Sequence, residues 1–142
     1  DIQVSVSAYV PDDYVPDVDE KMLFYQRLGE VKQTVEVLAI EEELQDRFGK
    51  LPQPTESLLD TIHVRLLARH LQAETVKVGP TMTLQFVPEK ELSRDEVERM
   101  VKQSARPLQF FLGEDARVEV VLEGETASSR LSSAKKVLMS LV

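Results

Sequence analysis

Carboxylates are the residue type in this chain with the most obvious capacity for chemistry, because they occur in close pairs and triplets. They stand at Asp12/Asp13, Glu41/Glu42/Glu43, Glu89/Glu91 and Asp95/Glu96. Such groups act as general acid and base when burial or a neighbouring like charge raises one pKa. These pairs and triplets all fall in segments expected to be turns or solvated helix faces. We therefore expect surface charges here rather than a catalytic pair.

The histidines and serines give no stronger indication of catalysis. His63 and His70 lie seven residues apart on one predicted helix, wider than the His-x-x-x-His spacing of a shared metal. Without any cysteine, disulfides, thiolate nucleophiles and Cys-ligated zinc are excluded. No glycine-rich phosphate loop occurs, and nothing argues for a Ser-His-Asp triad. We expect ordinary surface or boundary histidines, no metal and no cofactor.

Composition narrows the classes of partner. The chain has 142 residues, with 25 acidic against 17 basic side chains and a net charge of -8. Phosphate backbones bind clustered Lys and Arg, so direct nucleic-acid binding is disfavoured, whereas a basic protein partner is compatible with the charge but not required by it. No long apolar run or signal peptide is found, so no membrane segment is expected. The length suits one domain, and the absence of an initiator Met suggests a fragment of a larger protein.

The first thirty residues predict a strand, a turn and a helix. Residues 2–6 alternate between apolar and polar side chains, which is typical of a half-buried strand. A turn is expected at residues 11–13. A helix is predicted over 16–30, with Pro16 in its first turn and acidic side chains at its start. Its expected apolar stripe consists of Val18, Met22, Phe24, Tyr25 and Leu28.

Two further helices follow. Thr34 is the expected N-cap of the second helix, which ends at Gly49 because Pro52 prevents continuation. Its expected buried face is formed by Val37, Ile40, Leu44 and Phe48. The third helix is predicted to begin at Pro54 and to end near residues 71–73.

Beyond residue 73 the apolar period changes from 3.6 to 2. A hairpin is predicted around the turn Gly79-Pro80, and Ser93 with Glu96 forms a capping box that opens a short helix. Strands are expected over 108–112 and 117–122, and a last helix from Thr126 or Ser128. The predicted fold is α+β. In a single domain of 1–142, residues 1–73 are mainly helical with three helices after a first strand, and 74–142 form a small sheet with two further helices.

Charged side chains cluster at the end of the second helix. At 100° per residue, Glu43, Asp46 and Arg47 fall on a face beside the buried one, and Glu36 points the same way. Glu43 and Arg47 are four residues apart, and an exposed pair of this kind contributes only about 0.3–0.5 kcal/mol. Buried against a partner, the same charges could matter by about 2–5 kcal/mol. From the residues alone a solubilising helix face is the simpler interpretation.

Three segments of the first half carry a resemblance to a known family. They are Ala8-Tyr9-Val10-Pro11-Asp12-Asp13-Tyr14-Val15-Pro16-Asp17, Phe24-Tyr25-Gln26-Arg27-Leu28 and Glu43-Leu44-Gln45-Asp46-Arg47-Phe48-Gly49-Lys50-Leu51-Pro52. In order and spacing they closely resemble the C-terminal domain of bacterial transcription-repair coupling factors over residues 5–72. The resemblance is looser from about residue 73.

The resemblance implies a cytoplasmic parent protein that moves along double-stranded DNA by ATP hydrolysis. Such a protein displaces stalled RNA polymerase and recruits the damage-recognition subunit of nucleotide excision repair. Its motor, which uses ATP and Mg²⁺, and its polymerase-binding module would lie outside this chain.

The family's C-terminal domain is non-catalytic and autoinhibitory. It docks on the N-terminal repair-recruiting domain, masks that domain and restrains the motor. The docking surface of the family includes a Glu-x-x-Asp-Arg element, which here is Glu43, Asp46 and Arg47. The resemblance therefore favours an interdomain interface for these residues. An interaction module acting in trans, a small hydrolase and a DNA-binding domain remain as alternatives.

Overall fold

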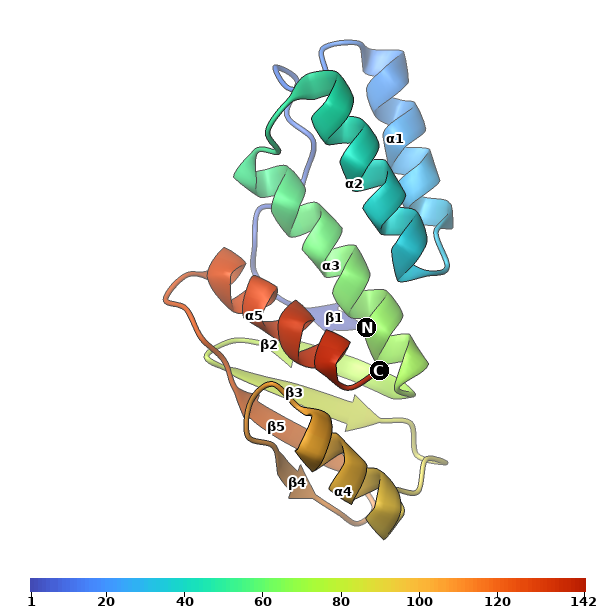
Figure 1. Cartoon of the computed structure of the whole chain (residues 1–142), viewed down its shortest axis with the longest axis vertical. Coiled ribbons are helices and arrows are strands. Elements are labelled where there is room, and N and C mark those ends of the chain that lie inside the picture. Colours follow the sequence, from blue (N-terminus) through green and yellow to red (C-terminus); the bar gives the residue numbers. More distant parts are fainter.

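The computed structural model describes residues 1–142 and has three helices at one end and a five-stranded sheet at the other (Figure 1). The helical end consists of α1 (Val18–Glu30), α2 (Thr34–Phe48) and the first turns of α3 (Gln53–His70). The other elements are β1 (Ile2–Gln3), β2 (Ala73–Val78), β3 (Thr81–Phe86), α4 (Arg94–Gln103), β4 (Gln109–Phe111), β5 (Arg117–Val121) and α5 (Ala127–Ser140). The predicted α+β class, with three helices after a first strand and two more in the sheet half, is confirmed.

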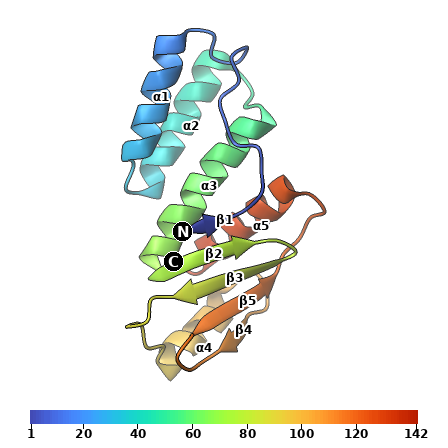
Figure 2. The same ribbon diagram turned by 180° about the vertical axis from the view of Figure 1, so that it is seen from behind.

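The sheet has the strand order β1-β2-β3-β5-β4. β1 pairs parallel with β2, and the other neighbours are antiparallel. Val76 lies opposite Leu84, which lies opposite Val118, so one buried row crosses three strands. Helices α3, α4 and α5 cover one face, and no helix lies over the face turned to the viewer in Figure 2. This single covered face explains the strict alternation of apolar and polar residues in the hairpin.

Two apolar cores are joined by α3. One core lies among the sheet, α3 and α5, and includes Val64 and Leu67 of α3. The other lies under α1 and α2, and includes Leu59 and Ile62 of the same helix. At 1.5 Å rise per residue, the 18 residues of α3 span about 27 Å, long enough to serve both cores. α3 therefore fixes the position of the α1–α2 pair relative to the sheet.

Several local predictions are confirmed. Gly79 and Pro80 connect the two strands of the β2–β3 hairpin. Ser93 caps α4 by accepting a hydrogen bond from the backbone N–H of Glu96 at 3.1 Å. Thr126, rather than Ser128, is the N-cap of α5. Gly49 ends α2 with a φ of 88°, a conformation that favours glycine.

The starts of the first two helices were predicted at the wrong residues. Pro16 lies before α1, because Asp17 is the N-cap and accepts from the backbone N–H of Glu20 at 3.0 Å. Thr34 is the first residue of α2 rather than its cap, and Gln33 takes the cap position. For α2 the cause is the carboxylate of Glu36, which lies inside the helix and accepts from the backbone N–H of Gln33.

The predicted apolar stripe of α1 is only partly buried. Phe24 and Leu28 are buried, whereas Val18 and Met22 are exposed by 64% and 50%. α1 packs mainly on one side, against α2 and the chain segment before it, so only a narrow face is covered. The first strand is also shorter than the predicted alternation, because only Ile2 and Gln3 pair with β2.

A candidate docking surface on helices α1 and α2

Glu43 is held by two arginines on the exposed side of the α1–α2 pair. The guanidinium of Arg27, on α1, donates to both carboxylate oxygens of Glu43 at 3.0 and 2.9 Å. Arg47, one turn along α2, donates to the same carboxylate at 3.3 Å. Hydrogen bonding from Arg27, reinforced by the positive charges of Arg27 and Arg47, lowers the pKa of Glu43. Glu43 therefore stays ionised and ties the two helices together.

Arg47 links the same helices a second time. It forms an ion pair with Glu20 of α1, and this hydrogen bond raises its pKa. Its guanidinium carbon also lies 5.0 Å from the ring centre of Phe48 and 5.7 Å from that of Phe24. Stacking on two rings and pairing with two carboxylates restrict this side chain to one orientation.

The cluster is partly exposed. Side-chain exposure is 44% for Arg27, 35% for Glu43, 43% for Arg47 and 38% for Glu20. Asp46 is exposed and forms none of the chain's ion pairs. We call Glu20, Arg27, Glu43, Asp46 and Arg47 the α2 cluster. These side chains are exposed enough to contact a partner, and the carboxylate of Asp46 carries a charge that no ion pair of the chain neutralises.

Glu36 is set apart from this cluster by its contacts. Its carboxylate accepts from the backbone N–H groups of Lys32 and Gln33, both at 3.1 Å. Those bonds satisfy donors at the start of α2 and explain why the helix begins at Thr34. Of the four residues predicted for the interface, the structure joins Glu43 and Arg47 by an ion pair, leaves Asp46 exposed on the same helix and gives Glu36 a capping contact.

Sequence reasoning missed Glu20 and Arg27 as members of the cluster. Arg27 lies 16 residues from Glu43, and Glu20 lies 27 residues from Arg47. Contacts at such separations depend on how α1 is placed against α2, which no local pattern reveals. The available signal was the position of Arg27 within one of the three segments that carry the family resemblance.

Tyrosines fix the helices below the cluster. The hydroxyl of Tyr14 lies 2.8 Å from the carbonyl oxygen of Gly49 and 3.1 Å from that of Leu44, so it holds the end of α2. The backbone N–H of Val10 donates to the hydroxyl of Tyr25 on α1 at 2.7 Å. The segment before α1 therefore connects both helices, and burial raises the pKa of Tyr14.

His63 differs most from its prediction. It is 1% exposed rather than at the surface, and neither ring nitrogen has a hydrogen-bond partner. Burial, with a further contribution from the Lys135 ammonium, lowers the pKa of His63 to about 4. Lys135 itself pairs with Asp60 at 3.2 Å and so joins α5 to α3. The prediction failed because α3 packs both on α2 and on α5, which buries two of its sides.

The remaining candidate groups form no metal site. No three His, Asp or Glu side chains are arranged to hold a metal ion. Among the paired carboxylates, Glu41 is half-buried, and burial raises its pKa, partly offset by Lys135. Two surface cavities of about 360 and 370 Å³ contain none of those paired carboxylates, whereas a third of about 270 Å³ is lined by Glu96 and His70. No helix has the combination of length and apolar character needed to cross a bilayer.

Comparisons with known proteins give a consistent result. The family model for the TRCF domain matches residues 4–97. The transcription-repair-coupling factor of Haemophilus influenzae is 30% identical over 135 residues, which is 87% of this chain and 12% of that protein. The factor of Myxococcus xanthus is 28% identical over 143 residues, which is 99% of this chain and again 12% of the relative. The chain therefore spans about an eighth of these curated relatives.

The same fold occurs among solved structures. The crystal structure of the C-terminal domain of a transcription-repair coupling factor superposes with a TM-score of 0.80 at 19% identity. The match covers 99% of this chain and 90% of that one. It includes the sheet half, where the sequence alone showed only a loose resemblance.

Proposed function

The chain belongs to the TRCF domain family, and from that premise we propose that it is the autoinhibitory C-terminal domain of a transcription-repair coupling factor. In this proposal residues 1–142 form one regulatory domain without catalytic activity or a cofactor of its own. It docks on the N-terminal repair-recruiting domain of the same cytoplasmic protein and masks it. The motor that uses ATP and Mg²⁺, and the sites for RNA polymerase, DNA and the damage-recognition subunit, lie elsewhere in the parent.

The α2 cluster is the observation that carries this proposal. Its ion pairs fix Glu43 and Arg47 before any partner arrives, so docking would immobilise few additional side chains. Three carboxylates and two guanidinium groups leave one negative charge over, which we assign to the unpaired Asp46. A partner surface that offers a cation to Asp46 would complete the network.

Tethering makes a weak contact sufficient for this role. Interfaces between domains of one chain typically bury about 600–1,500 Å² and are rather polar. A flexible tether gives an effective concentration near ~1 mM, so an affinity of only ~10 μM holds the closed state at about 100 to 1. Such a contact silences the protein and still releases when a competing partner binds.

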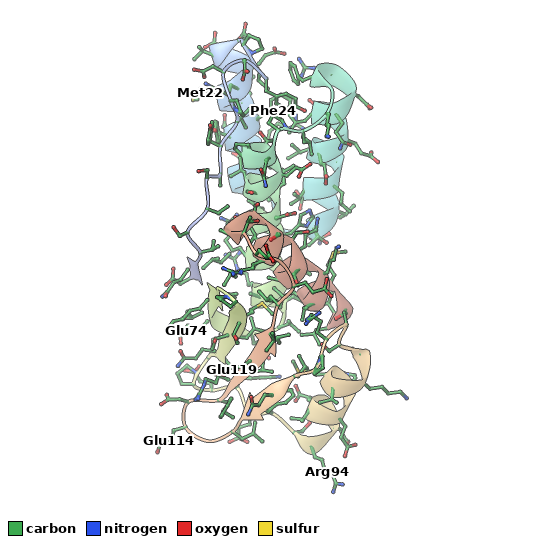
Figure 3. The ribbon with its side chains drawn as sticks, turned by 90° about the vertical axis from the view of Figure 1, so that its left-hand side faces the viewer. Met22, Phe24, Glu74, Arg94, Glu114 and Glu119 are labelled. Atoms are coloured by element: carbon green, nitrogen blue, oxygen red, sulfur yellow. The ribbon has the colours of Figure 1, made fainter.

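Asp46→Lys in the full-length parent is the sharpest test of the cluster. It reverses the one charge of the α2 cluster that forms no ion pair, so the domain should remain folded. Glu114→Lys is the matched control, because it makes the same charge change in the β4–β5 loop, at the far end of the molecule from α2 (Figure 3). We expect Asp46→Lys to raise binding of the damage-recognition subunit at least tenfold, and Glu114→Lys to leave it as in wild type. Equal binding by both variants would refute the assignment of the site.

A triple alanine variant of Glu43, Asp46 and Arg47 should also release the repair-binding surface. Because it removes the ion-pair partners of Arg27 and Glu20, its fold must be checked by circular dichroism. A pulldown with the isolated chain then separates the alternatives. Autoinhibition expects the parent's N-terminal region as the captured partner, whereas selective capture of another protein supports an interaction module acting in trans.

A further inference from the structure

α1 presents an apolar surface that neither core uses. Val18, Met22 and Leu23 are exposed by 64%, 50% and 58%, and we call these three residues the α1 patch. Figure 3 shows Met22 on the side of α1 away from α2, and Phe24 between the two helices. Isolated apolar residues are common on protein surfaces, but Val18 and Met22 lie within about 40° of each other on the helix, and Leu23 lies about 100° further round.

Most of this patch faces away from the α2 cluster. Glu20 and Arg27 point toward α2, since both pair with its side chains. At 100° per residue, Val18 and Met22 lie about 160° around the helix from Glu20. A partner on Val18 and Met22 would therefore approach α1 from a direction different from that of a partner on Asp46. The inference does not depend on the autoinhibitory role.

The surroundings of the patch are strongly acidic. Between residues 12 and 21 there are five carboxylates and one ammonium, and that ammonium, Lys21, is paired with Asp12. More broadly, residues 1–52 contain twelve acidic and five basic side chains, whereas residues 53–142 contain thirteen and twelve. Almost all of the net charge of the chain therefore surrounds α1 and α2.

We propose that the α1 patch binds a basic amphipathic helix of a partner protein. Val18 and Met22, four residues apart, form a ridge along an exposed helix, which suits packing against the apolar stripe of another helix. Lys and Arg beside that stripe would meet Asp13, Asp19 and their neighbours. A second copy of this chain is a poor occupant, because its own patch would bring the same five carboxylates against them.

A labelled peptide tests this proposal directly. The probe is a fluorescein-labelled amphipathic peptide of Leu and Lys, about 18 residues or five helical turns long. We expect fluorescence anisotropy to show binding to the 142-residue chain that weakens as NaCl rises from about 50 to about 500 mM. Val18→Ser combined with Met22→Ser should weaken binding about tenfold or more. Leu112→Ser combined with Val121→Ser, equally exposed residues of the sheet half, should leave it unchanged.

Both double variants must first be shown to fold like wild type. Circular dichroism and the melting temperature should match wild type for both double variants, since all four side chains are exposed. The proposal is overturned if the α1 double variant binds as tightly as wild type, or if a Leu and Glu peptide binds as well as the Lys peptide. It is also overturned if the chain sediments as a dimer that the α1 double variant abolishes, because the occupant would then be a second copy.

Discussion

His63 should make this protein lose stability as the pH falls through the weakly acidic range. The ring is 1% exposed without a hydrogen-bond partner, and its pKa is lowered from 6.5 to about 4 by burial and by Lys135. Because the folded pKa lies below the unfolded one, the unfolded chain binds more protons between these values. The free energy of unfolding therefore rises with pH in this window.

The size of the effect follows from the two pKa values. Relative to neutral pH, the contribution of His63 to the free energy of unfolding falls by about 2 kcal/mol at pH 5 and by about 3 kcal/mol at pH 4. This contribution is constant well above pH 6.5 and constant again well below pH 4. His63→Leu removes this dependence and also two unpartnered nitrogen atoms, so the variant should be more stable at pH 7.5 by about 1–3 kcal/mol.

Urea unfolding of wild type and His63→Leu at pH 7.5, 6, 5 and 4.5 measures how the difference in their free energies of unfolding depends on pH. Subtracting the two curves cancels the titration of carboxylates that both proteins share, including that of Glu41 nearby. His70→Gln is the matched control, because it replaces the other histidine of the same helix at an exposed position. The reasoning is refuted if the stability difference between wild type and His63→Leu stays constant from pH 7.5 to 4.5.

Two further predictions concern the connection between α3 and β2 and the α2 cluster. Gln72 has a φ of 62°, the only positive value outside glycine, so Gln72→Gly should relieve that conformation and raise the free energy of unfolding by up to about 1 kcal/mol in urea. A decrease in the free energy of unfolding would show that the Gln72 side chain makes a contact that stabilises the fold by more than its positive φ costs. A double-mutant cycle of Arg27→Ala and Glu43→Ala should give a coupling of about 0.5–1 kcal/mol that shrinks in high salt, because the pair is bidentate but more than a third exposed. A coupling of zero at low salt would mean that the pair does not join α1 to α2.

Local signals in the sequence predicted most of the elements and their ends. The turn at Gly79-Pro80, the Ser93 cap and the glycine that closes α2 all depend on contacts within a few residues. The pair formed by Glu43 and Arg47 is of the same kind, since one helical turn separates them. The capping contact of Glu36 is also local, yet it was missed because Thr34 offered a more familiar cap at the next position.

Burial was harder to predict than the elements themselves. Val18 and Met22 were expected in the apolar stripe of the first helix, and His63 at the surface or boundary, but the structure exposes the first two and buries the third. The spacing of apolar residues along a helix indicates that one face is apolar, but it does not indicate how many neighbouring elements the helix packs against. α1 is covered along a narrow face, whereas α3 packs against α2, α5 and β2. The number of packed layers therefore decided these positions.

The sequence by itself determined the family, the α+β order of elements and the concentration of negative charge in the first 52 residues. Composition and short-range contacts carry this information, and folding does not change it. Only the tertiary structure decided that Arg27 and Glu20 neutralise part of the α2 cluster while Asp46 remains unpaired, and that α1 leaves an apolar patch in solvent. The physical reason is that ion pairing and burial depend on which surfaces meet, and those surfaces belong to segments far apart in the chain.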